Sequence, residues 1–404
     1  MHIINGGVCA PKGFSAGGIH CGIRKNRSKR DLALIISQVP ASASAVYTQN
    51  LVKGAPIYVT QRNLVDGIAQ AAICNSGNAN TCNADGESIA WKMCELTAEA
   101  AGIKPENVIV ASTGVIGQPL SIEPIQTGMS ALYSSVHSDG SQEAAEAIMT
   151  TDTKLKEVAV SFTAGGVECK LGGIAKGSGM IHPNLATMLV FLTCDAAITP
   201  LLLKKALSEN VQDTFNMTSV DGDTSTNDMV CIMSNGLAGN ALIDKEDEDY
   251  HAFCAALNEV TSTLCRSIAK DGEGATRLIT CIVNGGKTIH DAKLAAKSVI
   301  CSSLFKAAIF GADANWGRVL CALGYSGADL DIHAVDVSFR SAKGEIMVCQ
   351  HGASLPFSEE KAKEILLEDE IDVLISLHDG DASATAWGCD LTYDYVKING
   401  DYRT

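Results

Sequence analysis

Runs of apolar residues bounded by turn-forming residues recur along the chain and predict buried strands. The clearest run, Met188–Leu192, contains no polar residue and follows a flexible, glycine-rich stretch. Such a run is typical of a strand buried on both faces. Similar patterns predict strands over 71–75, 107–112, 158–162, 229–233 and 276–283. Segments 55–59 and 391–398, the latter rich in aromatic and β-branched residues, are also expected to be extended.

A second pattern, with a period near 3.6 residues, predicts helices between these strands. Ile89, Met93, Leu96 and Ala100 lie on one face of a helix that Gly102 would close. Further helices are predicted over 140–149, 199–215, 247–270, 293–310 and 358–368. Helices and strands alternate without an internal repeat, so the expected fold class is α/β or α+β with mixed sheets. With 404 residues, the chain is expected to form two lobes.

Charge and cysteine usage narrow the range of functions. A net charge of −15 disfavours nucleic acids and anionic membranes as partners, because both require a basic surface. No apolar run approaches the ~20 residues of a membrane span. The 15 cysteines include no Cys-x-x-Cys pair and several occupy apolar runs, so neither a metal site nor a disulfide framework is expected. These features favour a cytoplasmic protein.

Polar, glycine-bearing turns follow several of the predicted strands. The segment 75–83 is dense in Asn and Gly, and is either a structural turn or a loop that lines a site. The loop 219–228 resembles a calcium loop only superficially, since the glycine needed at its sixth position is absent, and it is read as a polar turn or a substrate rim. Dinucleotide-binding, phosphate-loop and α/β-hydrolase motifs are also absent.

Thr187 stands where the glycine-rich stretch meets the strand 188–192. A Thr hydroxyl is a weak nucleophile that needs a base. Cleavage of the Ala186–Thr187 peptide would place a new α-amine, with a pKa near ~8, beside that hydroxyl. Attack by Oγ on the carbonyl of Ala186 gives an ester that water then opens. The products would be an α chain of residues 1–186 and a β chain of residues 187–404.

The motifs around Thr187 resemble those of the ornithine acetyltransferases, the bifunctional glutamate N-acetyltransferases of arginine biosynthesis. The resemblance spans nearly the whole chain, and the segment from Lys176 to Thr187 is its most specific part. The matching segments are 13–18, 75–80, 112–117, 176–181, 184–189, 271–277 and 311–318, together with Asn399 and Thr404.

This resemblance implies a self-cleaving, aminopeptidase-like fold and an acetyl-enzyme formed on Thr187. It implies ping-pong transfer of acetyl from N-acetylornithine to glutamate, no cofactor or metal, and an α₂β₂ assembly. Acetyl-CoA serves some members as a second donor, and the residues do not decide that. Carried over by position, Thr187 is the nucleophile, and Thr113 and Gly114 form the oxyanion site. The implied substrate contacts are Thr150, Lys176, Thr187, Glu273, Asn399 and Thr404, with Thr151 as the neighbouring alternative to Thr150.

The chemistry of these residues agrees with those roles. Thr113 and Gly114 lie in a turn that can present hydrogen-bond donors to an oxyanion. Lys176 suits a substrate carboxylate, and Glu273 suits a substrate ammonium. Either charge alone is more often a solvated surface group. The occurrence of both beside glycine-rich loops favours a zwitterionic, amino-acid-like substrate.

Two other functions are consistent with the same residues. A self-cleaving Thr or Ser amidase or aminopeptidase shares the cut but transfers the acyl group to water. A non-catalytic amino-acid-binding protein keeps an intact chain of 42.3 kDa. A denaturing gel distinguishes the binding protein, which stays one chain, from the self-cleaving enzymes. An assay of acetyl transfer to glutamate distinguishes the amidase or aminopeptidase from the acetyltransferase.

Overall fold

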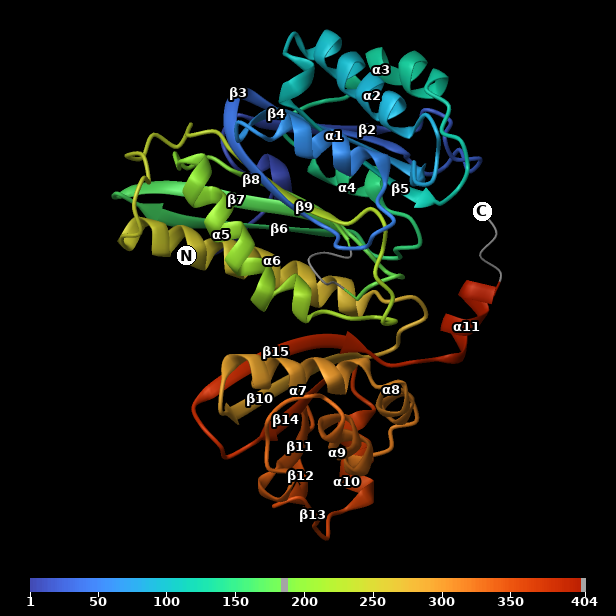
Figure 1. Cartoon of the computed structure of the whole chain (residues 1–404), viewed down its shortest axis with the longest axis vertical. Helices are drawn as coiled ribbons and strands as arrows, with labels where there is room; N and C mark the ends of the chain where they lie inside the picture. The colour runs from blue at the N-terminus through green and yellow to red at the C-terminus, as the bar shows by residue number, and fades with distance from the viewer. Residues whose placement is uncertain (183–187, 401–404) are drawn as a thin grey trace. The chain divides into compact units, whose positions relative to one another are not determined.

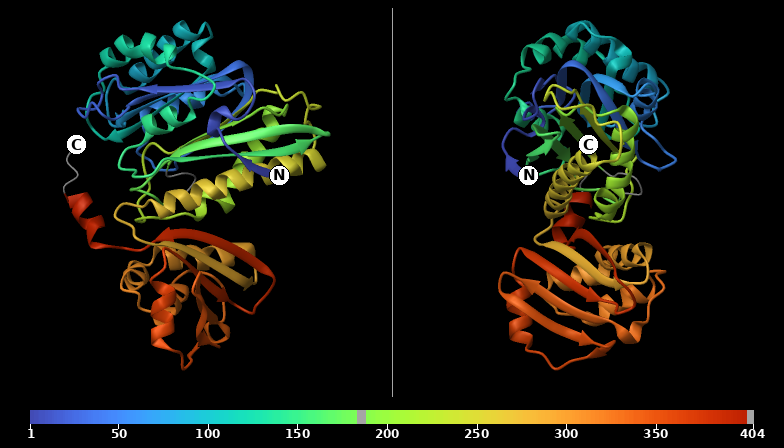
Figure 2. Two further views of the ribbon diagram at one scale, coloured as in Figure 1. Left: turned by 180° about the vertical axis from the view of Figure 1, so that it is seen from behind. Right: turned by 90° about the vertical axis from the view of Figure 1, so that its left-hand side faces the viewer.

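The computed structural model describes residues 1–182 and 188–400, which divide into two compact units (Figures 1 and 2). Unit 1 comprises Met1–Gly177, the described part of Pro183–Phe215, and Thr224–Leu264. Unit 2 comprises Ser178–His182, Asn216–Asp223 and the described part of Cys265–Thr404. The predictions of two lobes and of a mixed α/β class are confirmed.

Unit 1 is built on a nine-stranded sheet of order β1-β6-β7-β8-β9-β3-β4-β5, with β2 paired to β3. Its strands are β1 (His2–Ile4), β2 (Phe14–Ile19), β3 (Leu32–Tyr47), β4 (Ile68–Asn78), β5 (Val108–Val115), β6 (Lys156–Ala164), β7 (Val167–Lys176), β8 (Leu189–Cys194) and β9 (Met229–Ser234). The long strand β3 pairs with β2 through its first half and with β9 through its second half. It therefore joins the two halves of the sheet.

The strands that flank residues 183–187 are neighbours in this sheet. β8 runs antiparallel to β7, with Leu189 opposite Lys176, and parallel to β9, with Leu189 opposite Met229. All six residues of β8 are buried, as the apolar run 188–192 predicts. The chain before residue 183 and the chain after residue 187 thus contribute adjacent strands to one core.

The helices of unit 1 pack on its sheet, one of them mainly through small residues. They are α1 (Ala55–Asn63), α2 (Gly86–Ala101), α3 (Glu123–Ser134), α4 (Ser141–Ile148), α5 (Pro200–Asp213) and α6 (Glu248–Lys270), of which α6 continues beyond Leu264 into unit 2. α4 approaches β2 so closely that a Cβ on Gly18 would lie 2.3 Å from the carbonyl oxygen of Glu143. Glycine is required there, because any side chain would separate helix and strand.

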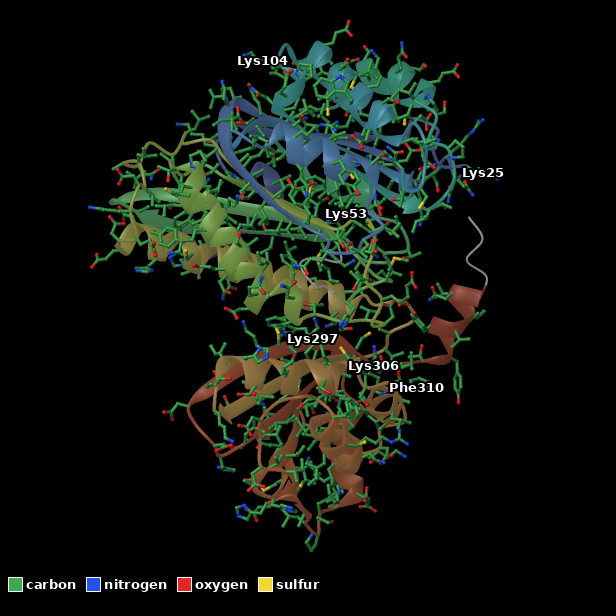
Figure 3. All side chains as sticks on the ribbon, viewed as in Figure 1. Lys25, Lys53, Lys104, Lys297, Lys306 and Phe310 are labelled. Carbon is green, nitrogen blue, oxygen red and sulfur yellow. The ribbon has the colours of Figure 1, made fainter. Side chains whose placement is uncertain are left out.

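Unit 2 contains a six-stranded sheet of order β13-β12-β11-β14-β10-β15. Its elements are α7 (Ile289–Cys301), α8 (Ser303–Phe310), α9 (Trp316–Gly324), α10 (Glu359–Leu366), α11 (Tyr393–Gly400), β10 (Leu278–Gly286), β11 (Asp336–Ser341), β12 (Gly344–Gln350), β13 (Ala353–Ser354), β14 (Glu370–Ser376) and β15 (Ala382–Cys389). α7 packs on β10 and β15. The buried ammonium of Lys306 on α8 (Figure 3) donates a hydrogen bond to the carbonyl of Val220 and ties the segment Asn216–Asp223 to this unit.

Most predicted elements are confirmed, and three are wrong. Segment 55–59 begins helix α1, because Pro56 stands in its first turn, where proline is favoured. The predicted helix 293–310 is two helices divided at Ser302, whose side chain accepts the N–H of Phe305 and caps α8. The predicted strand 391–398 is helix α11 over most of its length. Among the helices described, none is long and apolar enough to cross a membrane.

Candidate active site

The structure places four of the predicted site residues in unit 1 and two in unit 2. Thr113, Gly114, Thr150 and Lys176 belong to unit 1. Glu273 and Asn399 belong to unit 2. Ala186 and Thr187, which form the predicted cleavage site, and the terminal Thr404 lie outside the described residues.

Thr113 and Gly114 lie at the end of β5, where its ladder with β4 becomes irregular. The pairing shifts register around Gly77 and Asn78. Gly114 has a φ of +131°, and a Cβ on it would lie 2.3 Å from the carbonyl carbon of Gly77. Both its φ and this close approach require glycine. The backbone therefore turns at this point without any side chain to obstruct it.

Lys176, the last residue of β7, meets this turn. Its Nζ lies 3.4 Å from Oγ1 of Thr113, although the two residues are 63 positions apart in the chain. Both side chains are almost fully buried. A buried ammonium beside a hydroxyl and a glycine turn forms a positive, donor-rich corner, which suits a carboxylate or an oxyanion.

A buried ion pair that the sequence analysis did not identify holds two of these residues in place. The carboxylate of Asp152 lies 2.7 Å from Nζ of Lys156, and it accepts hydrogen bonds from the N–H of Gly177 at 2.7 Å and the N–H of Thr150 at 2.9 Å. Asp152 thus fixes the backbone next to Lys176 and at Thr150. The only sequence signal was its position directly after Thr150 and Thr151.

The electrostatics of this ion pair explain how a carboxylate stays charged when buried. Burial by itself raises the pKa of Asp152, but the ammonium groups of Lys156 and Lys176 and the N–H of Gly177 outweigh it. The pKa of Asp152 is therefore held well below its usual range. The carboxylate remains ionised at neutral pH and keeps its contacts to the site backbone.

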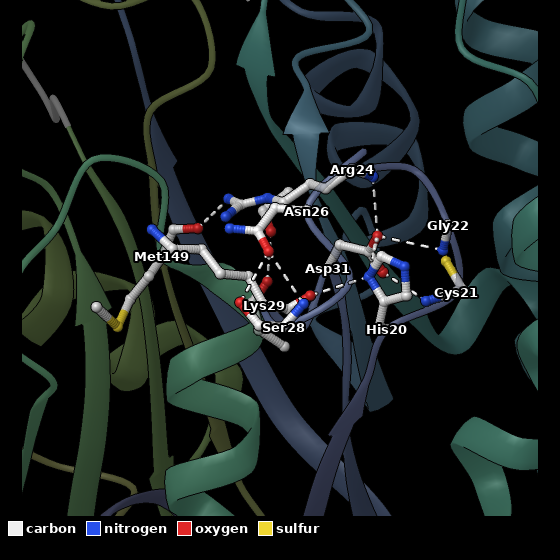
Figure 4. Close-up of polar contacts among 11 residues, drawn as sticks. His20, Cys21, Gly22, Arg24, Asn26, Ser28, Lys29, Asp31 and Met149 are labelled. Carbon is white, nitrogen blue, oxygen red and sulfur yellow. Dashed lines mark hydrogen bonds and ion pairs between the residues drawn. The ribbon is translucent and has the colours of Figure 1, made fainter.

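The loop that precedes β3 brings the side chain of Arg24 to Met149 (Figure 4). The buried carboxylate of Asp31 accepts hydrogen bonds from the N–H of Cys21 at 2.6 Å and of Arg24 at 2.9 Å. The guanidinium of Arg24 donates to the carbonyl of Met149, the residue before Thr150. Arg24 had not been predicted, because its link to residue 149 is formed only by the fold.

The side chains of the asparagine-rich turn make structural hydrogen bonds. The buried Asn75 accepts the hydroxyl of Ser112 at 2.5 Å and donates to the carbonyl of Asn78 at 3.0 Å. Asn227, from the distant polar loop, donates to the carbonyls of Ala79 and Ser112. The amide groups are therefore engaged with backbone and hold the β4–β5 corner and the segment before β9 together.

The acidic loop 219–228 shows no arrangement of metal ligands. Asp221 accepts the N–H groups of Met180 at 2.6 Å and Ile181 at 2.8 Å with its two carboxylate oxygens. Within residues 1–182 and 188–400, no group of three or more His, Cys, Asp or Glu side chains is placed to hold a metal ion. Asp221 serves instead to shape the segment that leads toward residue 183.

Glu273 and Asn399 meet in unit 2. Nδ2 of Asn399 donates to Oε2 of Glu273 at 2.8 Å, and the N–H of Glu273 donates to the carbonyl of Ser178 at 2.9 Å. A Cβ on Gly179 would lie 2.4 Å from the carboxyl carbon of Glu273. The glycine-rich stretch is thus needed for close approach to this carboxylate.

These features define a class of protein. Unit 1 carries a buried cation, a threonine hydroxyl and a side-chain-free turn, and unit 2 carries an anion held by an amide. A threonine hydroxyl and a buried ammonium beside a glycine turn are groups with which an enzyme of acyl transfer can stabilise an oxyanion.

Comparison with known proteins identifies the family. The model of the ArgJ family matches residues 15–404. The arginine biosynthesis bifunctional protein ArgJ of Caldanaerobacter subterraneus is 50% identical over 405 residues and covers 100% of both chains, and that of Symbiobacterium thermophilum is 50% identical over 406 residues with the same coverage. The chain belongs to the ArgJ family, and it is an acyltransferase of arginine biosynthesis, as the motifs predicted.

A solved structure agrees with this assignment. The crystal structure of arginine biosynthesis bifunctional protein ArgJ from Bacillus halodurans shares 45% identity and a TM-score of 0.51 with this chain. It covers 54% of this chain and 100% of its own. Over the matched part of the chain, the fold described here is that of this ArgJ protein.

Proposed function

We propose that this chain cuts itself between Ala186 and Thr187 and transfers acetyl from N-acetylornithine to glutamate through an ester on Thr187. The observation that carries the proposal is the approach of Lys176 to Thr113, 3.4 Å apart, beside the glycine turn at Gly114. Lys176 is opposite Leu189 in the sheet, only two residues after Thr187. The strand partner of Lys176 is therefore only two positions from the proposed nucleophile in the sequence.

Self-cleavage begins as an N-to-O acyl shift. Oγ of Thr187 bonds to the carbonyl carbon of Ala186, and the proton of that hydroxyl passes to the nitrogen of Thr187 as the C–N bond breaks, which leaves an ester and a free α-amine. Water opens the ester, which gives the carboxylate of Ala186 and restores the hydroxyl. The fragments are residues 1–186 and 187–404.

Acetyl transfer repeats this chemistry on an external substrate. The α-amine of Thr187 takes the Oγ proton as Oγ attacks the acetyl carbonyl of N-acetylornithine. Thr113 and the backbone at Gly114 stabilise the oxyanion that forms. The C–N bond of acetylornithine then breaks, its nitrogen takes the proton, and ornithine leaves. The amine of glutamate attacks the acetyl ester by the reverse sequence, which makes the reaction ping-pong.

Two of the proposed contacts have charges that suit an amino-acid substrate. Lys176 suits the α-carboxylate of the amino acid, and the Glu273–Asn399 pair suits an ammonium group. Thr150 and Thr404 complete the proposed contacts. The relatives are named arginine biosynthesis proteins, which supports acetylornithine and glutamate as the particular substrates.

The proposal also covers how the two fragments assemble and which acetyl donors the enzyme uses. The two fragments stay together as an α₂β₂ heterotetramer in the cytoplasm, and the reaction needs no cofactor or metal. Acetyl-CoA is a second candidate donor, and the word bifunctional in the relatives' names supports it. An assay of glutamate acetylation with each donor separately tests this point.

The experiment that tests the proposal compares Thr187→Ala with Thr187→Ser. The Ala variant should remain one chain on a denaturing gel and transfer no acetyl group, whereas the Ser variant keeps a hydroxyl and should be cut. Cleavage of the Ala variant would refute the proposal. Wild-type protein that is cut but gives acetate instead of N-acetylglutamate would support the amidase alternative.

A further inference from the structure

A short basic loop stands out on the surface of an otherwise acidic protein. Five of the seven residues from 24 to 30 are Lys or Arg, whereas the whole chain has a net charge of −15. The loop belongs to unit 1 and connects β2 to β3. Like charges this close in sequence repel one another, so an anion that neutralises them stabilises the loop.

The fold attaches the base of this loop to the sheet of unit 1. The carboxylate of Asp31 is fully buried and accepts the N–H groups of Cys21, Gly22 and Arg24. The carbonyl of Asp31 accepts the N–H of Ser76 on β4 at 2.9 Å. The first cation of the loop therefore has a fixed place beside the β4–β5 turn.

Arg24 brings the loop to the rim of the donor-rich corner at Lys176. A Cβ on Gly77 would lie 2.8 Å from Cγ of Arg24, and Gly77 is opposite Gly114 in the β4–β5 ladder. Burial raises the pKa of the Cys74 thiol to about 12, and the charges of Lys176 and Arg24 both act against that rise. Both cations therefore lie near one buried thiol, and the base of the loop borders the corner.

Three cations of the loop remain available to a ligand. Arg30 is paired with Glu146 at 2.9 Å. The side chains of Lys25, Arg27 and Lys29 are exposed, and none of them has an ion pair or hydrogen bond within residues 1–182 and 188–400. Figure 3 shows Lys25 at the outer surface of unit 1. Exposed Lys and Arg side chains of this kind are the groups that bind phosphate in proteins.

We propose that the loop 24–30 is a subsite for the phosphate groups of a nucleotide-linked acyl donor, for which acetyl-CoA is the candidate. This inference rests on the proposed function. Lys25, Arg27 and Lys29 bind the phosphates, and the acetyl end of the same molecule is directed past Arg24 to the corner at Lys176. The step is binding alone and forms no covalent bond. N-acetylornithine has no phosphate group and makes no use of the three free cations.

The test is a loop variant that combines Lys25→Gln, Arg27→Gln and Lys29→Gln, assayed with two thioester donors. S-acetylpantetheine has the same acetyl thioester as acetyl-CoA but lacks the phosphate groups. The wild type should prefer acetyl-CoA over S-acetylpantetheine by about 10-fold in kcat/KM, and the loop variant should lose most of that preference. Added salt should reduce the preference of the wild type, because exposed charges are screened.

A matched control removes the same charge from other parts of unit 1. Lys12, Lys104 and Lys204 are exposed, and Figure 3 shows Lys104 on a different part of the surface from Lys25. Their joint replacement by Gln should leave the preference for acetyl-CoA unchanged. Calorimetric titration with coenzyme A adds a readout that does not depend on turnover. The loop variant should bind coenzyme A about 10-fold more weakly than the wild type and the control.

The outcomes separate this inference from the proposed function. A wild type that transfers acetyl from acetylornithine but neither binds coenzyme A nor uses acetyl-CoA would overturn the inference alone. An equal preference for acetyl-CoA in the wild type and the loop variant would also overturn it. So would displacement of coenzyme A by inorganic phosphate at the same concentration, which would indicate a nonspecific anion patch. A wild type that gives no N-acetylglutamate from either donor would overturn the proposed function, and the titration would still decide whether the loop binds phosphates.

Discussion

At the scale of single residues, the site depends on contacts between side chains that are far apart in sequence. Thr113 lies near the end of one strand and Lys176 ends another, and only the sheet brings their polar atoms within 3.4 Å. Under the proposed function, the loss of the Thr113 hydroxyl is expected to weaken the stabilisation of the oxyanion directly.

Thr113→Ala should lower turnover by about 10²-fold, or about 3 kcal/mol of transition-state stabilisation. The physical reason is the loss of one donor to a developing negative charge in a buried corner. Thr113→Ser retains the hydroxyl and serves as the matched control. Steady-state kinetics with acetylornithine and glutamate provide the measurement, and wild-type turnover in the Ala variant would contradict the assignment. Gly114 acts through its backbone, so side-chain deletion does not test it.

Asp152→Asn should destabilise the protein by about 3–5 kcal/mol, because it leaves the ammonium of Lys156 buried without this carboxylate. Urea unfolding at neutral pH measures the difference. The double variant Asp152→Asn with Lys156→Met removes both charges and should recover most of the loss. An Asp152→Asn variant as stable as the wild type would show that the ion pair contributes nothing.

The same ion pair predicts a dependence of stability on pH. The pKa of Asp152 is lowered in the folded state, so its contribution is present in full above the unfolded pKa of about 3.9 and is lost as pH falls toward the folded value. The difference in stability between wild type and Asp152→Asn should therefore shrink from about pH 5 downward. Urea midpoints measured at a series of pH values would show this, and a constant difference would refute it.

At the scale of elements, helix α11 takes the place of a strand predicted from local propensity. Aromatic and β-branched residues favour strands, but this preference is weak when no neighbouring strand pairs with the segment. The hydroxyl of Thr392 donates to the carbonyl of Gly274 at 2.6 Å just before the helix, and Asn399 donates to Glu273 near its end. The helix therefore brings Asn399 to Glu273, and it anchors the end of the chain in place of the predicted strand.

Deletion of residues 399–404 should leave self-cleavage intact and reduce kcat/KM for acetylornithine by at least ~10-fold, or ~1.4 kcal/mol. The cut needs only the chain around Thr187, whereas substrate binding loses the amide of Asn399. Val396→Ala, a change at an exposed position of the same helix, is the control and should have no effect. Unchanged kinetics in the truncated protein would show that the tail has no part in binding.

At the scale of the whole molecule, the proposed fragments do not coincide with the two compact units. Unit 1 contains β7 from before the proposed cut and β8 from after it, paired from Leu171–Lys176 to Leu189–Cys194. β3, from before the proposed cut, likewise pairs with β9, from after it. Each fragment alone would expose the buried faces and edges of these strands to water.

The two fragments should therefore copurify after cleavage and sediment as one species. Sedimentation velocity in buffer and in denaturant gives the measurement, with the uncut Thr187→Ala protein as the control for size. Fragments that separate in buffer would contradict this expectation. A species of twice the mass of one cut chain would support the α₂β₂ assembly.

The sequence by itself determined the features of this protein that a short stretch of residues can encode. The buried strand after Thr187, the helix ended by Gly102 and the motifs of the family all lie within short stretches, where periodicity and residue type carry the information. The same motifs were enough to predict Thr113, Gly114, Lys176, Glu273 and Asn399 as site residues.

Only the tertiary structure decided which of these groups meet and which further residues serve them. Asp152 and Arg24 carry no local signature, because what distinguishes each is a partner on a remote segment. Helix α11 likewise depends on contacts with Glu273 and Gly274, more than 100 positions earlier. Burial and hydrogen bonding between distant segments set these features, and neither leaves a periodic trace in the sequence.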